Sequence, residues 1–302
     1  MIQPARLAWE LCRDTFSCWL GDKGARLGAA LAFYSLFAIG PLLVIVVAVA
    51  SALSGGADTS AALDRQLASL VGMETATTIE SFLNGIQRQG SGTFAALASL
   101  ATMLVAASAV VIQLKDALNT IWQVKPKPGR SLKIFFQDYI VSLASLFALG
   151  LVLITSLAVA QGLDGIGTFL DTSLPIMRVA FKTLNDGVSF ALVTLLFAAI
   201  YKLLPDVRLH WRDVLPGAVV TSMLFFLGRF AFSVYLKQQN LASIYGATAS
   251  LLGISLWVYY FSQIIFLGAE FTKVYAMRFK GRVDPRSGVD WVSATVGKRE
   301  PF

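Results

Sequence analysis

The feature that most constrains this chain is the stretch from Lys202 to Ala276, where two long apolar runs follow one another. Arg229 lies inside the first run, and Glu270 closes the second. An apolar run of about 20 residues is long enough for a helix to cross the hydrocarbon core of a bilayer. A charged side chain within such a run is costly unless it meets water, a partner or a functional need. The stretch therefore predicts membrane-spanning helices whose charged residues require an explanation.

Composition extends this interpretation to the whole chain. Of the 302 residues, 56% are hydrophobic and 14% charged, whereas soluble domains carry about 25% charged residues. Six apolar runs predict an all-α, polytopic membrane protein with six transmembrane helices, of which the fourth is the shortest. These runs occupy residues 27–57, 89–114, 139–163, 187–201, 214–236 and 238–269.

The distribution of Lys and Arg predicts the orientation, because positively charged loops stay in the cytoplasm. Alternate connecting segments collect 19 such residues on one side and 5 on the other, which places both termini in the cytoplasm. The net charge of +7 is then a consequence of topology, and we expect no nucleic-acid partner. The expected partners are membrane lipids, with anionic headgroups at the cytoplasmic face. Assembly into a homo-oligomer stays open.

Three regions follow from this pattern. Residues 1–26 form a cytoplasmic amphipathic segment, which either lies at the membrane interface or packs against the helix bundle. Residues 27–276 form the six-span domain, with short periplasmic helices predicted within 55–92. Residues 277–302 are expected to be a disordered cytoplasmic tail.

The motifs that carry common enzyme chemistry are missing from the sequence. It has two cysteines and one histidine, and it lacks a phosphate-binding glycine loop, an HExxH motif and a nucleophile elbow. Its acidic residues are scattered over both predicted sides of the membrane. We therefore expect a protein that is not an enzyme and that holds neither a cofactor nor a metal.

Arg229 is the first candidate site residue. It either extends to the outer interface beside its phenylalanine neighbours, or faces the bundle and binds an anionic group with Ser222 on roughly its face. At the rise of a helix, Arg229 lies near the outer leaflet in the fifth span, whereas Glu270 lies near the cytoplasmic end of the sixth. A salt bridge between the two is therefore not expected.

Glu270 is the second candidate, and it shares a helical face with Gln263 and Tyr260. Its predicted partner is either Lys115 or Lys273, and it is either a structural pair or a gate residue. Pro41, in the first span, predicts a kink that can line a cavity.

Three blocks of sequence carry a family resemblance. They are ARLGAALAFYSLFAIGPLL in the first span, LLPDVRLHWRDVLPGA at the entry to the fifth, and IYGATASLLGISLWVYYFSQIIFLGAEF in the sixth. The chain resembles the YihY and virulence factor BrkB family of bacterial inner-membrane proteins over nearly all of residues 20–276. The resemblance implies six helices and cytoplasmic termini in the inner membrane. It brings no catalytic motif, although the family has carried a ribonuclease BN label.

Three functions of different classes remain as hypotheses. The first is a transporter or lipid-handling protein for an anionic or amphipathic substrate, in which Arg229 attracts the anionic group while Glu270 and Gln263 form an inner gate. The second is a structural or scaffolding protein of the cell envelope that transports nothing. The third, a ribonuclease, is disfavoured because the acid, metal and histidine constellation is missing.

Overall fold

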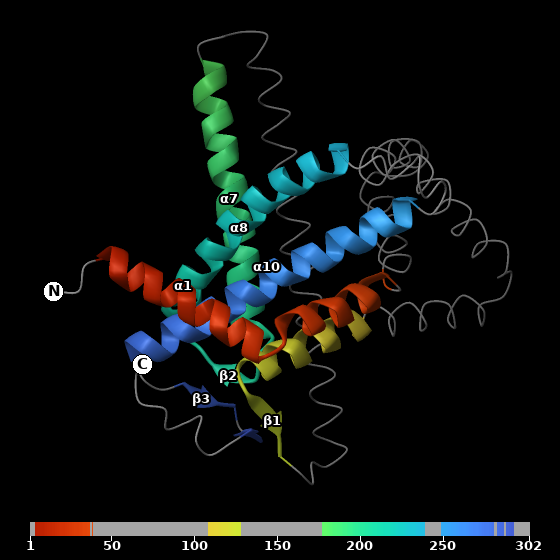
Figure 1. The fold of residues 1–302 in the computed structure, drawn as a ribbon. Helices are drawn as coiled ribbons and strands as arrows, with labels where there is room; N and C mark the ends of the chain where they lie inside the picture. Colours follow the sequence, from red (N-terminus) through yellow and green to blue (C-terminus); the bar gives the residue numbers. More distant parts are fainter. Residues whose placement is uncertain are drawn as a thin grey trace, which may run out of the picture. The chain divides into compact units, whose positions relative to one another are not determined.

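The structure is a computed structural model that describes residues 4–36, 38, 108–127, 177–238, 249–280, 283–286 and 288–292 (Figure 1). This part of the chain is mostly helical, which confirms the predicted class. The labelled helices are α1 (Pro4–Gly21), α7 (Met177–Leu203), α8 (Trp211–Gln238) and α10 (Ala249–Lys280). Further helical residues occupy 24–36 and 108–121.

The chain divides into two compact units. The first contains Met1–Gly24, Leu114–Leu227 and Ile264–Phe302, and the second contains Ala25–Gln113 and Gly228–Gln263. In the first unit, the core holds the fully buried side chains of Trp122, Phe197, Tyr201 and Phe266.

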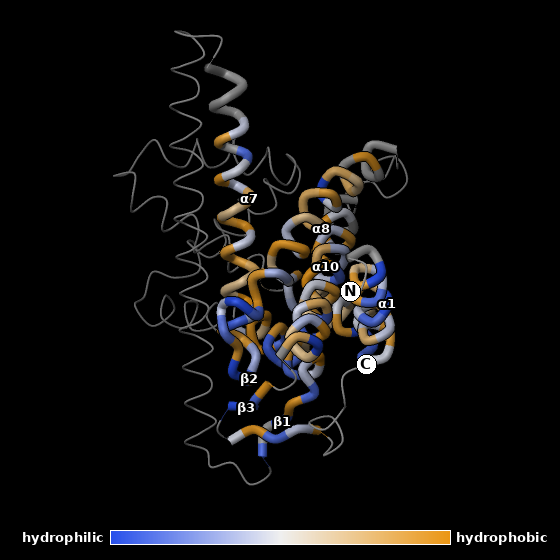
Figure 2. Tube along the Cα trace, turned by 90° about the vertical axis from the view of Figure 1, so that its left-hand side faces the viewer, coloured by the Kyte–Doolittle hydropathy of each residue, from blue (hydrophilic) through white to orange (hydrophobic). Residues whose placement is uncertain are grey.

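Three described helices are long and apolar enough to cross a membrane, over Asp186–Leu203, Trp211–Phe232 and Gly253–Phe279. They correspond to the fourth, fifth and sixth predicted runs, and apolar residues predominate along them in Figure 2. The predicted run 139–163 and most of 27–57 and 89–114 lie outside the described residues, as do the predicted periplasmic helices.

Two predicted boundaries differ from the structure. Helix α7 begins at Met177, well before the predicted start of its span at 187. Helix α10 continues to Lys280, past the predicted end at 269, so Glu270 lies inside the helix. The apolar run ends at the first charged residue, but the helix continues. Its charged side chains have partners: Lys273 pairs with Asp22, in the turn after α1, and Arg278 pairs with Glu10 on α1.

Helices α8 and α10 pack closely and antiparallel in the first unit. At their contact, a glycine of each helix lies against a threonine of the other helix. Gly217 of α8 meets Thr272 of α10, and Thr221 of α8 meets Gly268 of α10. Glycine lets two helix backbones approach closely, which is how helices in membranes associate. Tyr201 of α7 joins this contact by donating its hydroxyl to the carbonyl of Ile265 at 2.8 Å.

Short strands near the ends of the helices form two small sheets, which the predicted all-α class did not include. Strand β1 (Val124–Pro126) pairs with β4 (Val289–Trp291), and β2 (Val207–Arg208) pairs with β3 (Asp284–Pro285), both antiparallel. The prediction of disorder from residue 277 is wrong for these segments, because the tail supplies β3 and β4. The physical reason is backbone pairing with two distant loops, which low hydrophobicity in the tail itself does not reveal.

Candidate functional site

The six residues predicted from sequence fall in different parts of the molecule. Glu270 and Ser222 belong to the first unit, whereas Arg229, Tyr260 and Gln263 belong to the second. Pro41 lies outside the described residues.

Glu270 is completely buried, at 0% exposure, and its partner is Lys273 one helical turn later. The Lys273 ammonium donates to Glu270 Oε2 at 3.0 Å and to Asp22 Oδ2 at 2.8 Å. Gln123 Nε2 donates to the other Asp22 oxygen at 3.3 Å. We call Asp22, Gln123, Glu270 and Lys273 the buried charge cluster. Of the two partners predicted for Glu270, the structure selects Lys273.

Two turns in left-handed backbone conformation bring this cluster together. Helix α1 ends at Gly21, and Lys23 then adopts a φ of 56°. The helix over 108–121 ends in the same way, with Gln123 at a φ of 54°. A left-handed residue after a helix end is a common helix stop, although glycine usually occupies it. Each turn places a polar side chain, Asp22 or Gln123, at the side of α10.

Cys18 on α1 lies next to the cluster and responds to it. Burial raises the pKa of its thiol, while the nearby Lys273 acts in the opposite direction and the carboxylates Glu270 and Asp22 add to the rise. The shift favours the neutral thiol over the thiolate, so Cys18 adds no negative charge to the cluster at physiological pH.

A second buried ion pair involves the LLPDVRL block. Asp206 follows α7, and its Oδ1 lies 3.1 Å from Lys115 Nζ. Asn119 donates to Asp206 Oδ2 at 3.0 Å and accepts the Asp206 backbone N–H at 2.8 Å. Every acceptor of this carboxylate thus has a donor. Lys115, the alternative partner predicted for Glu270, is engaged here instead.

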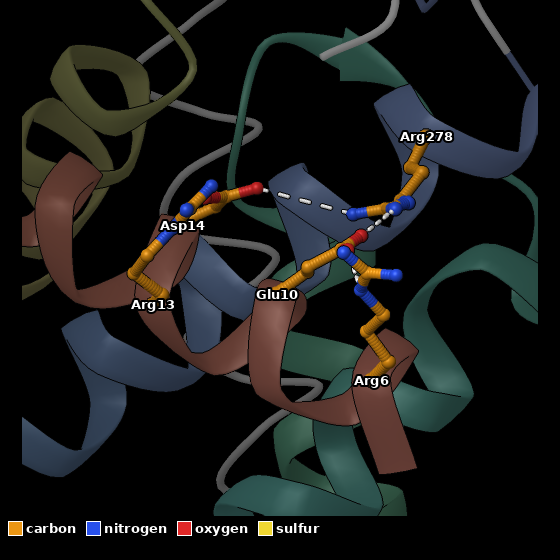
Figure 3. A network of polar contacts seen from close by, with 5 residues as sticks. All are labelled: Arg6, Glu10, Arg13, Asp14 and Arg278. Atoms are coloured by element: carbon orange, nitrogen blue, oxygen red, sulfur yellow. Dashed lines mark hydrogen bonds and ion pairs between the residues drawn. The ribbon is translucent and has the colours of Figure 1, made fainter. Parts of the chain in front are cut away.

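Ionic contacts on the surface of the first unit hold α1 against the end of α10 (Figure 3). Arg278 on α10 donates to Glu10 and lies 3.9 Å from Asp14 Oδ2. Arg6 and Arg13 neutralise the same two carboxylates from within α1. This contact fixes the position of α1, and with it the position of Asp22 just beyond its end.

Ser222 contributes to helix packing. Its hydroxyl donates to the Ala218 carbonyl at 2.9 Å and accepts from Thr194 of α7 at 3.0 Å. This is the usual back-bonding of a serine within a membrane helix, extended by one interhelical hydrogen bond.

The second unit contains the remaining predicted residues. Both polar atoms of the Gln263 side chain are buried and have no hydrogen-bond partner among the described residues, and the amide packs onto Gly28. Tyr260 stacks on Phe232 with ring centroids 5.8 Å apart. Arg229 has an exposed side chain on α8.

Sequence reasoning missed Asp22, Gln123 and Asp206 as parts of buried polar clusters. Asp206 had a usable signal, because it lies between apolar residues in a block that carries the family resemblance. Asp22 and Gln123 had none, since a polar residue in a loop is ordinarily solvated. Chemically, the buried charge cluster can hold a positive charge or exchange a proton, and its only amine, that of Lys273, is hydrogen-bonded to two carboxylates and is therefore not a free nucleophile.

Comparisons with known proteins agree with this architecture. The sequence profile described as virulence factor BrkB matches residues 15–289. A UPF0761 membrane protein of Pseudoalteromonas translucida is 29% identical over 258 residues, covering 80% of this chain and 78% of the relative. One from Cronobacter sakazakii is 28% identical over 255 residues, covering 83% of each chain.

A UPF0761 membrane protein of Xanthomonas oryzae is 25% identical over 255 residues, and this match covers 83% of the chain but only 57% of that longer relative. No solved structure matches the chain. The profile match extends from α1 to β4, over the whole of the region that builds the buried charge cluster. This protein is therefore a membrane protein of the virulence factor BrkB family.

Proposed function

We propose that this membrane protein is a transporter in the bacterial inner membrane for an anionic or amphipathic substrate, with six spans and cytoplasmic termini. The observation that carries the proposal is the Glu270 carboxyl group, which is completely buried in α10 while Oε1 lacks a hydrogen-bond partner among the described residues. Ionisable groups inside membrane helices mark substrate and ion pathways. A carboxylate kept only for stability is expected to have both oxygens satisfied, as Asp206 has.

Residues on different helices have different roles in the proposed transport. Arg229 on α8 attracts the anionic group of the substrate. On α10, Glu270 acts as a gate residue in the first unit. Gln263 acts in the second unit, where its amide, without a hydrogen-bond partner among the described residues, is suited to a polar ligand. Tyr260 and the kink expected at Pro41 line the pathway, and Ser222 supports it through the α7–α8 contact. The chain moves its substrate and performs no catalysis.

The surface of α1 supports a position at the cytoplasmic interface. Trp9, Phe16 and Leu20 are more than half exposed and recur at a spacing that places them on one helical face. Arg6 and Arg13 extend beside them with largely exposed side chains. Apolar side chains flanked by cations suit the boundary between acyl chains and anionic headgroups.

Transport is tested with the purified full chain in liposomes. The assay measures scrambling of labelled anionic lipids and uptake of labelled organic anions, for the wild type, Glu270→Gln and Arg229→Leu. We expect transport by the wild type and its loss in both variants. Asp290→Asn is the matched control, because it makes the same carboxyl-to-amide change at a half-exposed site and should transport normally.

Folding is checked for each variant by its elution as a single species and by its helical circular dichroism. A folded wild type that moves none of these substrates would contradict transport and favour the scaffolding alternative. Unchanged transport by Arg229→Leu would remove that arginine from the pathway.

A further inference from the structure

The buried charge cluster contains more acidic groups than basic ones. The carboxyl groups of Asp22 and Glu270 both contact the single ammonium of Lys273, at 2.8 and 3.0 Å. Gln123 adds a hydrogen bond but no charge. If every group is ionised, the cluster carries one negative charge in excess. An uncompensated charge away from water is among the most expensive features a protein can contain.

The excess charge can be assigned to one atom. Asp22 is satisfied on both oxygens, by Gln123 and by Lys273. Glu270 is satisfied on Oε2 only, and Oε1 is buried without a hydrogen-bond partner among the described residues. The missing positive charge therefore belongs on Glu270 Oε1.

Within the described part of the chain, the groups around the cluster do not supply this positive charge. Lys273 on the same helix is already shared between two carboxylates. From α1 the cluster meets the Cys18 thiol, which is neutral, and Asp14 near that thiol is held by Arg13 and Arg278. Two other buried polar centres in the first unit have no donor to spare, since Lys115 pairs with Asp206 and the Tyr201 hydroxyl donates to the Ile265 carbonyl.

A proton fits this position better than a metal ion does. A hard cation needs several oxygen ligands, and the described residues include no group of three acidic, histidine or cysteine side chains that could hold one. The Asp22 and Glu270 carboxyls contact the same Lys273 ammonium, at 2.8 and 3.0 Å, so two acidic groups lie close together beside one cation. Two ionised carboxylates this close repel one another and offer acceptors only, so one proton on either of them removes the repulsion.

We propose that Glu270 Oε1 binds one exchangeable proton and that this carboxyl is the proton-coupling group of the protein. An O–H bond forms on Oε1 with a proton taken from water, and the cluster becomes electrically neutral without any change in oxidation state. Release of the proton restores the excess negative charge beside Lys273 and weakens the contact of α10 with Asp22. The coupling role rests on the proposed transport function, whereas proton binding itself is measurable without transport.

The test is infrared difference spectroscopy of the full chain in lipid nanodiscs, recorded between neutral and alkaline buffer, a range in which exposed carboxyl groups stay ionised. A protonated carboxyl has a carbonyl stretch separate from the amide bands. We expect the wild type to show such a band, to lose it at alkaline pH and to shift it in heavy water, because the proton exchanges. Glu270→Gln should lack the band, and Asp290→Asn should keep it. Glu270→Asp, which retains a carboxyl group, should move the band without removing it and provides the comparison if the glutamine variant does not fold.

The outcomes separate this inference from the proposed function. A wild type without a titrating band, or a Glu270→Gln variant that keeps it, overturns the proton site whatever the liposome assay gives. A titrating band without any transport leaves the proton site standing and refutes the transport proposal. Transport that ignores an imposed pH gradient overturns the coupling role of Glu270.

Discussion

Replacing Lys273 by methionine tests the energetic importance of the buried charge cluster most directly. The substitution keeps the side-chain length and removes the ammonium that contacts Glu270 and Asp22. The side chains of Lys273, Glu270 and Asp22 are only 10%, 1% and 15% exposed, so little solvent screens the two carboxylates that remain. Removing one partner of a buried ion pair costs about 3–5 kcal/mol, because the other charge stays buried without compensation. We expect a loss of this size in the free energy of unfolding.

The matched control is Lys127→Met, which makes the same change in an ion pair with Asp290. Both of those side chains are more than half exposed, and such a surface pair contributes at most about 1 kcal/mol. Unfolding is followed by denaturant titration in mixed micelles with tryptophan fluorescence. Combining Lys273→Met with Glu270→Gln and Asp22→Asn removes all three charges and should recover most of the loss.

Equal, small losses for Lys273→Met and Lys127→Met would refute the reasoning, because they would show that solvent or lipid headgroups screen the cluster. A triple variant no more stable than Lys273→Met alone would also contradict it. The lost stability would then come from packing of the lysine side chain and not from the uncompensated carboxylates.

Three further predictions concern other parts of the first unit. Gly268→Ala should lower the free energy of unfolding by about 1–3 kcal/mol in the same titration, because a Cβ there would lie 1.9 Å from a threonine hydroxyl oxygen. Gly187→Ala is its control: a Cβ there meets nothing within 4 Å and should stabilise α7 by up to about 1 kcal/mol. Burial raises the pKa of Cys18, so its reaction with a maleimide should be slower than that of the exposed Cys12 at neutral pH and should need a higher pH to accelerate; equal rates in single-cysteine variants, measured by mass spectrometry, would contradict this. Arg286→Ala removes the guanidinium that donates to two backbone carbonyls at the end of α7, at 3.3 and 3.4 Å, and amide exchange over residues 283–292 should then become faster than in the wild type.

The predictions that depended on hydrophobic run length were the most reliable. The fifth predicted run corresponds to α8, and a helix between Lys202 and Gln238 follows from apolar residues that only a bilayer or a core can accommodate. Run length located helix ends poorly. The fourth predicted run began at residue 187, yet the preceding Asp186 also lies within α7, because an isolated charge does not end a helix whose backbone hydrogen bonds continue past it.

The candidate site was predicted only in part. Glu270 was identified because a carboxylate next to an apolar run is unusual, and Lys273 followed from helical spacing. Asp22 lies about 250 residues away in sequence and Gln123 about 150, and no periodicity links them to α10. Their contribution depends on where two helix-ending turns with positive φ place them.

By itself, the sequence determined that this is a helical membrane protein and which helices must be apolar, because burial of long uncharged runs is a property of composition and spacing. Only the tertiary structure decided the partners of its charges. Lys115 could have served Glu270, and it serves Asp206 instead. Ion pairing in a medium of low dielectric depends on distances of a few ångströms between distant segments. Those distances, and the one buried carboxylate oxygen left without a hydrogen-bond partner within the described part of the chain, follow from packing rather than from the order of the residues.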